Sequence, residues 1–182
     1  MFIAKGLMWI EEGQAMAEAF RGEFYQKVDG KARVSIPAAF RTVLNADDPS
    51  KGEKGGARLY MVYGGKARNF VECYSKQGAD RLAEDIEAMD MGSSERVRAE
   101  RDLISRSVMV EIDSDGRIVL PPRVREKMGF AGDIPGEAEA AFAGFTNRFR
   151  LYRREVYEAE LEADDEDDTD PLTLVGRHKR AG

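Results

Sequence analysis

A stretch of 14 residues occurs twice in this chain of 182 residues, at a constant offset of 84 positions and without a gap. Residues 28–41 read VDGKARVSIPAAFR, and residues 112–125 read IDSDGRIVLPPRVR. Four aligned pairs are identical: Asp29/Asp113, Arg33/Arg117, Pro37/Pro121 and Arg41/Arg125. Four further pairs are apolar in both copies. Agreement over this length indicates two copies of one structural unit, which limits the possible folds strongly.

Each copy predicts the same short series of elements. A run that alternates apolar and polar residues comes first, as in a half-buried strand. An Asp-Gly turn, a second strand and a proline follow, and the proline begins a short helix because a first-turn position needs no N–H. The expected ranges are strands 23–28 and 107–112, strands 33–36 and 117–120, and helices 37–44 and 121–128.

One such unit of about 25 residues is too small to bury a core by itself, whereas two units packed face to face can do so. Each copy is also followed by a later strand-like run, at 69–74 and at 148–152. The sequence between the copies, 76–106, has helical periodicity that Gly92 interrupts. The pattern therefore predicts an α+β fold in which two equivalent halves share one core.

The net charge of −6 conceals an uneven distribution. The chain has 34 acids and 28 Lys and Arg residues. The segment 158–182 holds nine of the acids and three of the bases, so residues 1–157 hold 25 acids and 25 bases. Six of the seven residues from Asp164 to Asp170 are acidic, and charges at that density repel and bury little apolar surface. We expect a solvated, low-complexity tail; the alternative is a competitor for a basic surface on this protein or a partner.

The scarcity of cysteine and histidine argues against several kinds of site. Cys73 is the only cysteine, so a disulfide framework and a cysteine-based zinc site are excluded, and we expect a buried core thiol. His178, the only histidine, lies in the polar tail, and Gly64-Gly65-Lys66 lacks the rest of a phosphate-binding loop. The sequence predicts no metal, no cofactor and no enzymatic activity.

No apolar run approaches the roughly 20 residues of a membrane span. The N-terminal apolar stretch is too short for a signal peptide, so we expect a cytoplasmic protein whose residues 1–18 form a leader, disordered or not.

The repeated Asp-x-x-x-Arg has two interpretations. In the first, Asp29 accepts turn N–H groups or pairs with Arg33, and nothing binds there. In the second, the turn presents Lys31 and Arg33 to DNA, because the planar arginine fork makes two parallel hydrogen bonds and a β-ribbon fits the major groove.

Local charge favours the second interpretation in copy one. Residues 21–41 carry a net +3, whereas residues 113–127 carry only +1, so Arg33 and Lys31 should lead and Arg117 should assist. We expect Arg41 and Arg125 to anchor phosphates or the hairpin base, and we include Arg21 among the DNA-binding residues. One chain offers few cations, so useful affinity requires several subunits.

At these residues the sequence resembles the MraZ family of bacterial transcription regulators. The resemblance covers roughly residues 19–157 and rests on FRGEF at 20–24, DGKARVSIPAAFR at 29–41 and DSDGRIVLP at 113–121. It implies a pseudo-twofold β-barrel made of two AbrB-like swapped-hairpin halves with short helices and a helical connection. The expected boundaries are 19–75, 76–106 and 107–157 for the two halves and their connection, and 158–182 for the tail.

The resemblance also implies a function. Such a protein would form a ring-like homo-oligomer, bind direct repeats in double-stranded DNA upstream of its own operon, and repress that division and cell-wall gene cluster in the nucleoid. The rival within the binding class is an AbrB-type antitoxin whose acidic tail blocks a basic toxin. The rival from another class is a small enzyme, for which the sequence offers neither nucleophile nor ligand cluster.

This sequence departs from the family pattern at Ala32, where the family has glycine. If the position requires a positive φ, alanine costs on the order of 1 kcal/mol. Gly30 taking over the turn is the alternative, with a different shape of the hairpin tip. In copy two, Asp115 just before Gly116 would repel phosphate.

Overall fold

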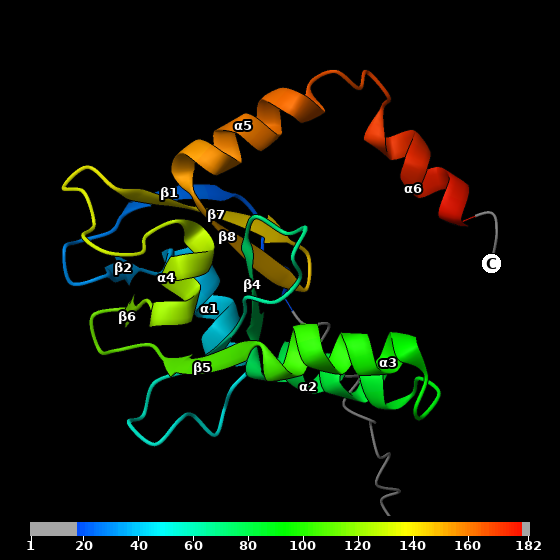
Figure 1. The fold of residues 1–182 in the computed structure, drawn as a ribbon, viewed down its shortest axis with the longest axis horizontal. Coiled ribbons are helices and arrows are strands. Elements are labelled where there is room, and N and C mark those ends of the chain that lie inside the picture. The colour runs from blue at the N-terminus through cyan, green and yellow to red at the C-terminus, as the bar shows by residue number, and fades with distance from the viewer. Residues whose placement is uncertain (1–17, 180–182) are drawn as a thin grey trace, which may run out of the picture.

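The computed structural model describes residues 18–179, and its elements follow the repeat (Figure 1). The expected leader, 1–18, lies outside the described residues except for Glu18. Copy one contributes β1 (Glu23–Lys27), β2 (Arg33–Ser35), α1 (Ala38–Ala46), β3 (Arg58–Val62) and β4 (Val71–Ser75). Copy two contributes β5 (Ser107–Glu111), β6 (Arg117–Val119), α4 (Pro122–Met128), β7 (Glu139–Phe145) and β8 (Arg148–Arg153).

Helices connect and extend the two copies. Between them lie α2 (Lys76–Glu87), α3 (Ser94–Ala99) and a π-helical segment, η1 (Glu100–Ser105), so the second helix expected over 94–106 widens after Ala99. This helical connection projects from the strands (Figure 1). After β8 come α5 (Arg154–Asp164) and α6 (Pro171–Lys179). Within residues 18–179, none of the helices combines the length and hydrophobicity that crossing a membrane requires.

The strands of the two copies interleave in one antiparallel sheet. Its order is β1-β7-β8-β4-β3-β5, while β2 and β6 form a separate two-stranded ribbon. Exchanging the equivalent strands of the two copies maps this order onto itself. The pairs β1–β7 and β3–β5 join strands of different copies, so neither copy completes its sheet alone. Among residues 18–179, β1 and β5 are outer strands, and no pairing closes the sheet into a barrel.

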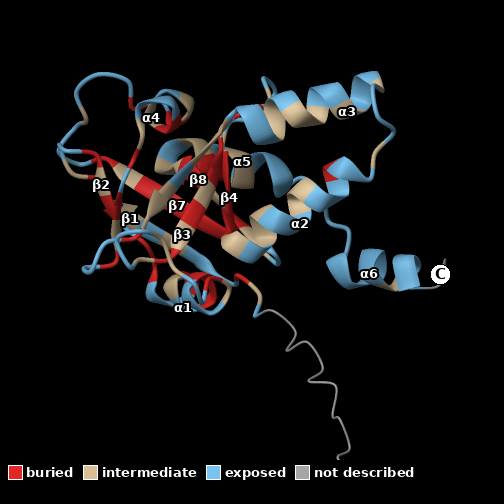
Figure 2. Ribbon diagram, turned by 90° about the horizontal axis from the view of Figure 1, so that it is seen from below, coloured by how far each residue is buried: buried red, intermediate tan, exposed pale blue. Residues whose placement is uncertain are grey.

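The core lies where the two copies meet, and aromatic rings fill its centre. Phe40 of α1 contacts Phe149 of β8 with ring centroids 4.9 Å apart, and Phe20 lies 5.4 Å from Phe40 at a near-perpendicular angle. The buried residues are concentrated on β3, β4, β7 and β8, whereas α3 and α6 are largely exposed (Figure 2). Cys73 is buried there as expected, and burial raises the pKa of its thiol far above the ordinary value.

Two strands and one helix were absent from the sequence prediction. Strands β7 and β3 each lie second from an edge of the sheet, and residues of the expected tail form α6. Helix α5 runs across the boundary expected between 157 and 158, and Tyr157 is buried against Tyr152, with ring centroids 4.9 Å apart. Every residue from Glu162 to Val175 is exposed, as a solvated segment requires.

Candidate nucleic-acid interface

The copy-one turn is held together by the Asp29 carboxylate. Its Oδ1 accepts hydrogen bonds from the backbone N–H groups of Lys31 and Arg33, both at 2.9 Å. Its Oδ2 accepts a 2.7 Å bond from Nε of Arg33. The hydrogen bonds that the local interpretation of Asp-x-x-x-Arg expects are present: the aspartate shapes the turn and orients the arginine. The side chain of Arg33 remains 38% exposed.

The copy-two turn repeats this frame atom by atom. Oδ1 of Asp113 accepts from the N–H groups of Asp115 and Arg117, both at 2.9 Å. Arg117, however, has two acidic partners: Asp115 Oδ2 at 2.9 Å from Nη2 and Asp113 Oδ2 at 3.6 Å from Nε. Its charge is thus countered more fully than that of Arg33.

The same hydrogen bonds keep both turn carboxylates ionised. The backbone N–H of Arg33 is the main cause that lowers the pKa of Asp29 below its ordinary value, and the N–H of Arg117 does the same for Asp113. Both turn carboxylates are therefore ionised at neutral pH.

The ribbon places the two repeated arginines on one face. Arg33 lies opposite Val119, and Ser35 lies opposite Arg117, so these four side chains share a face because directly paired residues point the same way. Val34 and Ile118, the intervening pair, are buried on the other face. Since β2 and β6 are antiparallel, the two turns lie at opposite ends of the ribbon. The outward face, defined by Arg33, Ser35, Arg117 and Val119, is the ribbon face.

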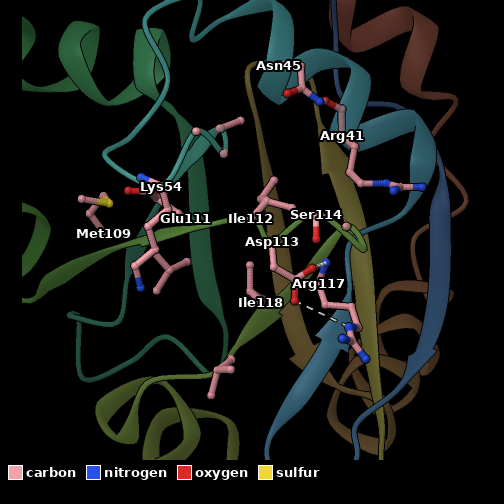
Figure 3. Close-up of a pocket in the computed structure, with 16 residues that line it drawn as sticks. Arg41, Asn45, Lys54, Met109, Glu111, Ile112, Asp113, Ser114, Arg117 and Ile118 are labelled. Atoms are coloured by element: carbon pink, nitrogen blue, oxygen red, sulfur yellow. Dashed lines mark hydrogen bonds and ion pairs between the residues drawn. The ribbon is translucent and has the colours of Figure 1, made fainter.

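Arg41 reaches from α1 to the turn of the other copy. A β-carbon at Gly116 would overlap the Arg41 guanidinium, so the two groups are in direct contact. Arg41 and Arg117 line the same cavity of about 840 Å³, together with Asn45 and Lys54 (Figure 3). The buried Nε atom of Arg41 has no hydrogen-bond partner among the described residues.

The remaining site residues predicted from sequence are distributed around the ribbon. Lys31 is exposed at the tip of the copy-one turn and forms no salt bridge within residues 18–179. Arg125, the equivalent of Arg41, also has a buried Nε without a partner in that range. Arg21 is exposed and lies just before β1, which is a strand of the six-stranded sheet. Arg21 is therefore not part of the ribbon.

Ala32 occupies the conformation that its glycine counterpart occupies in copy two. Its φ is 60°, and the φ of Gly116 is 75°. Gly30 does not have a positive φ, so the alternative in which Gly30 takes over the turn is wrong. The hydrogen bonds Ala32 N–H to Asp29 O and Gly116 N–H to Asp113 O, at 2.9 and 3.0 Å, require the same backbone path in both copies.

Sequence reasoning missed two members of the ribbon face, Ser35 and Val119. Both could have been found from the alternation of side chains along a strand, because each lies two positions from a repeated arginine.

The arginines of the segment 148–154 form salt bridges within the molecule: Arg148 and Arg150 pair with Glu72, and Arg154 pairs with Glu139 and Glu158. Among residues 18–179, no group of three or more metal-ligating side chains is arranged around a common point.

Proteins named Transcriptional regulator MraZ are similar to most of this chain. The one from Cereibacter sphaeroides is 51% identical over 152 residues, which is 83% of this chain and 89% of the relative. The one from Ruegeria pomeroyi is 39% identical over 145 residues, 80% and 83% of the two chains. A third, from a Ruegeria species, is 37% identical over 167 residues, 88% and 96%. No family model matches the chain. At these identities and coverages, the chain belongs to the MraZ family of transcriptional regulators.

Proposed function

We propose that this protein is a sequence-specific, DNA-binding transcriptional repressor, without enzymatic activity, whose ribbon face enters the major groove. The observation that carries the proposal is the placement of Arg33 and Arg117 on one outward face of a two-stranded ribbon. The major groove of B-DNA, about 12 Å wide, accepts such a ribbon, and an arginine fork pairs with the edge of guanine.

The two turns are unequal partners in this proposal. At the copy-one tip, Lys31 and Arg33 outnumber Asp29, whereas at the copy-two tip Asp113 and Asp115 outnumber Arg117. Copy one therefore attracts phosphate, and copy two repels it. Arg33 and Lys31 make the principal contacts, and Arg117 reads a base edge once the complex has formed.

The small number of cations in one chain favours assembly. Affinity for DNA rises with the number of phosphates neutralised, so a single ribbon binds weakly and several linked ribbons bind tightly. The outer strands β1 and β5 offer free edges, and β5 carries the exposed Met109. A homo-oligomeric ring that places its ribbons along direct repeats fits these features.

The targets follow from the family. We propose that the protein represses its own operon within the division and cell-wall gene cluster and is associated with the nucleoid. A footprint of the purified protein on the DNA upstream of its own gene tests this. Protection of regularly spaced direct repeats is the expected result, and uniform or absent protection contradicts it.

The contribution of each arginine is tested by gel-shift titration of that DNA. Arg33→Ala should weaken binding at least tenfold and Arg117→Ala less, while Arg98→Ala removes an exposed arginine of α3 and serves as the charge-matched control. Binding should also weaken steeply with salt. Equal binding by the wild type and all three variants would refute the assignment of the ribbon face.

A further inference from the structure

A second basic site lies away from the ribbon face. It is a cavity of about 640 Å³, and its lining combines five cationic side chains with one acid. Three chain segments supply them: the β3–β4 loop, the residue between η1 and β5, and α4. The charged lining residues of this basic cavity are Lys66, Arg68, Arg106, Arg123, Lys127 and Glu126.

Backbone contacts fix the walls of the basic cavity. The N–H of Tyr63 donates to the carbonyl of Arg106 at 3.0 Å, which ties the β3–β4 loop to the start of β5. Nζ of Lys127 donates to the carbonyl of Gly65 at 2.8 Å, which ties α4 to the same loop. A β-carbon at Gly64 would overlap the carbonyl of Asp102, so the loop lies directly on η1. The backbone segments that carry the cations are therefore held together by the fold.

The charges of the basic cavity are only partly compensated. Arg106 pairs with Asp102 at 2.7 Å, and Arg123 pairs with Glu126 at 3.2 Å. Arg68 pairs with Glu72, but that single buried carboxylate also serves Arg148 and Arg150. Within residues 18–179, Lys66 and Lys127 form no salt bridge. The basic cavity therefore carries an excess of at least two positive charges, those of Lys66 and Lys127.

Burial and neighbouring cations both disfavour the charged form of Lys127. Burial, followed by the charge of Arg68, lowers the pKa of its ammonium group below the ordinary value. An anion in the basic cavity would offset the part of this shift that Arg68 causes. A second cavity, of about 410 Å³ and beside Tyr74, lacks the imbalance, because its lining holds Glu18, Asp47 and Asp85 against Arg81 and Arg148.

We propose that the basic cavity binds a small anion that carries linked phosphate groups, such as a diphosphate. Three guanidinium groups favour phosphate because each matches two phosphate oxygens with parallel N–H donors. The number of uncompensated cations favours an anion of multiple charge over a monocarboxylate. The half-buried Lys127 favours a free ligand, since a DNA backbone presents singly charged phosphates on a convex surface.

Isothermal titration with inorganic pyrophosphate, on the full-length chain, tests the proposal. We expect one pyrophosphate per chain, and at least tenfold weaker binding by Lys66→Ala/Arg123→Ala. Both side chains are exposed, so the fold should survive, and an unchanged melting temperature checks this. Lys66→Ala alone is the substitute if the double variant does not fold. Arg81→Ala, which removes a cation from the second cavity, is the control and should bind as the wild type does.

A gel shift with the upstream DNA distinguishes a free anion from nucleic acid. We expect the double variant to bind DNA within twofold of the wild type. Pyrophosphate binding that is absent, or equal in the wild type and the double variant, overturns the proposal. A tenfold loss of DNA binding without a loss of pyrophosphate binding also overturns it, because the cavity then serves the DNA backbone.

Discussion

The two turns of the ribbon share one backbone frame and differ in what they present. Asp29 and Asp113 accept the same N–H bonds, and Ala32 and Gly116 share a left-handed backbone conformation. Yet Lys31 of copy one corresponds to Asp115 of copy two, which reverses the net charge of the tip. The scaffold tolerates divergence at the tip because the side chain there makes no bond that the turn requires.

The largest effect is expected from exchanging the charged residues at the two tips, which should change the affinity for DNA. Lys31→Asp changes the tip by two charges and should weaken DNA binding on the order of fiftyfold near 0.1 M salt, while Asp115→Lys should strengthen it. Gel-shift titration over a range of salt concentrations measures both. Arg98→Asp, with the same charge change on α3, should have a small effect; if it matches Lys31→Asp, only the overall charge matters.

The second-largest effect is expected at the residue with a positive φ, where the two turns should differ in their response to substitution. Gly116→Ala should lower the free energy of unfolding by about 2 kcal/mol, because alanine resists a positive φ and its β-carbon would displace Arg41. Urea denaturation measures the change. A neutral result would show that the Arg41 contact is loosely held.

The reverse substitution in copy one should be much milder. Ala32→Gly removes the cost of a positive φ on alanine. It also increases the conformational entropy of the unfolded chain and removes a buried methyl group, so the free energy of unfolding should change by less than about 1 kcal/mol. The same urea denaturation measures it. A destabilisation equal to that of Gly116→Ala would contradict the expected asymmetry.

Acid should loosen both turns alike, with the smallest effect. The folded pKa values of Asp29 and Asp113 lie below the ordinary value of 3.8, so their contribution is present above it and is lost as the pH falls through the folded values. The Asp29→Asn and Asp113→Asn variants should each flatten the decline of melting temperature between pH 5 and pH 2. An unchanged decline in both would show that other carboxylates control acid unfolding.

The limits of prediction are clearest at β7. Residues 139–145 read EAAFAGF, an almost continuous apolar run without the alternation that identifies a strand. Its residues 140–143 are buried on both faces, by the core and by the α5 side, and only that double coverage explains the composition. The repeat-based strands were predictable because one of their faces meets solvent.

The sequence by itself determined the local units: two turns, each closed by its own aspartate, and the proline that directly precedes each following helix. These depend on bonds between residues at most a few positions apart. Only the tertiary structure decided that strands exchange between copies, that Arg33 and Arg117 share a face, that Arg41 crosses to the other turn, and that five cations surround one cavity. Those arrangements depend on which apolar surfaces cover each other across some 84 residues, and burial of that kind leaves no local pattern in the chain.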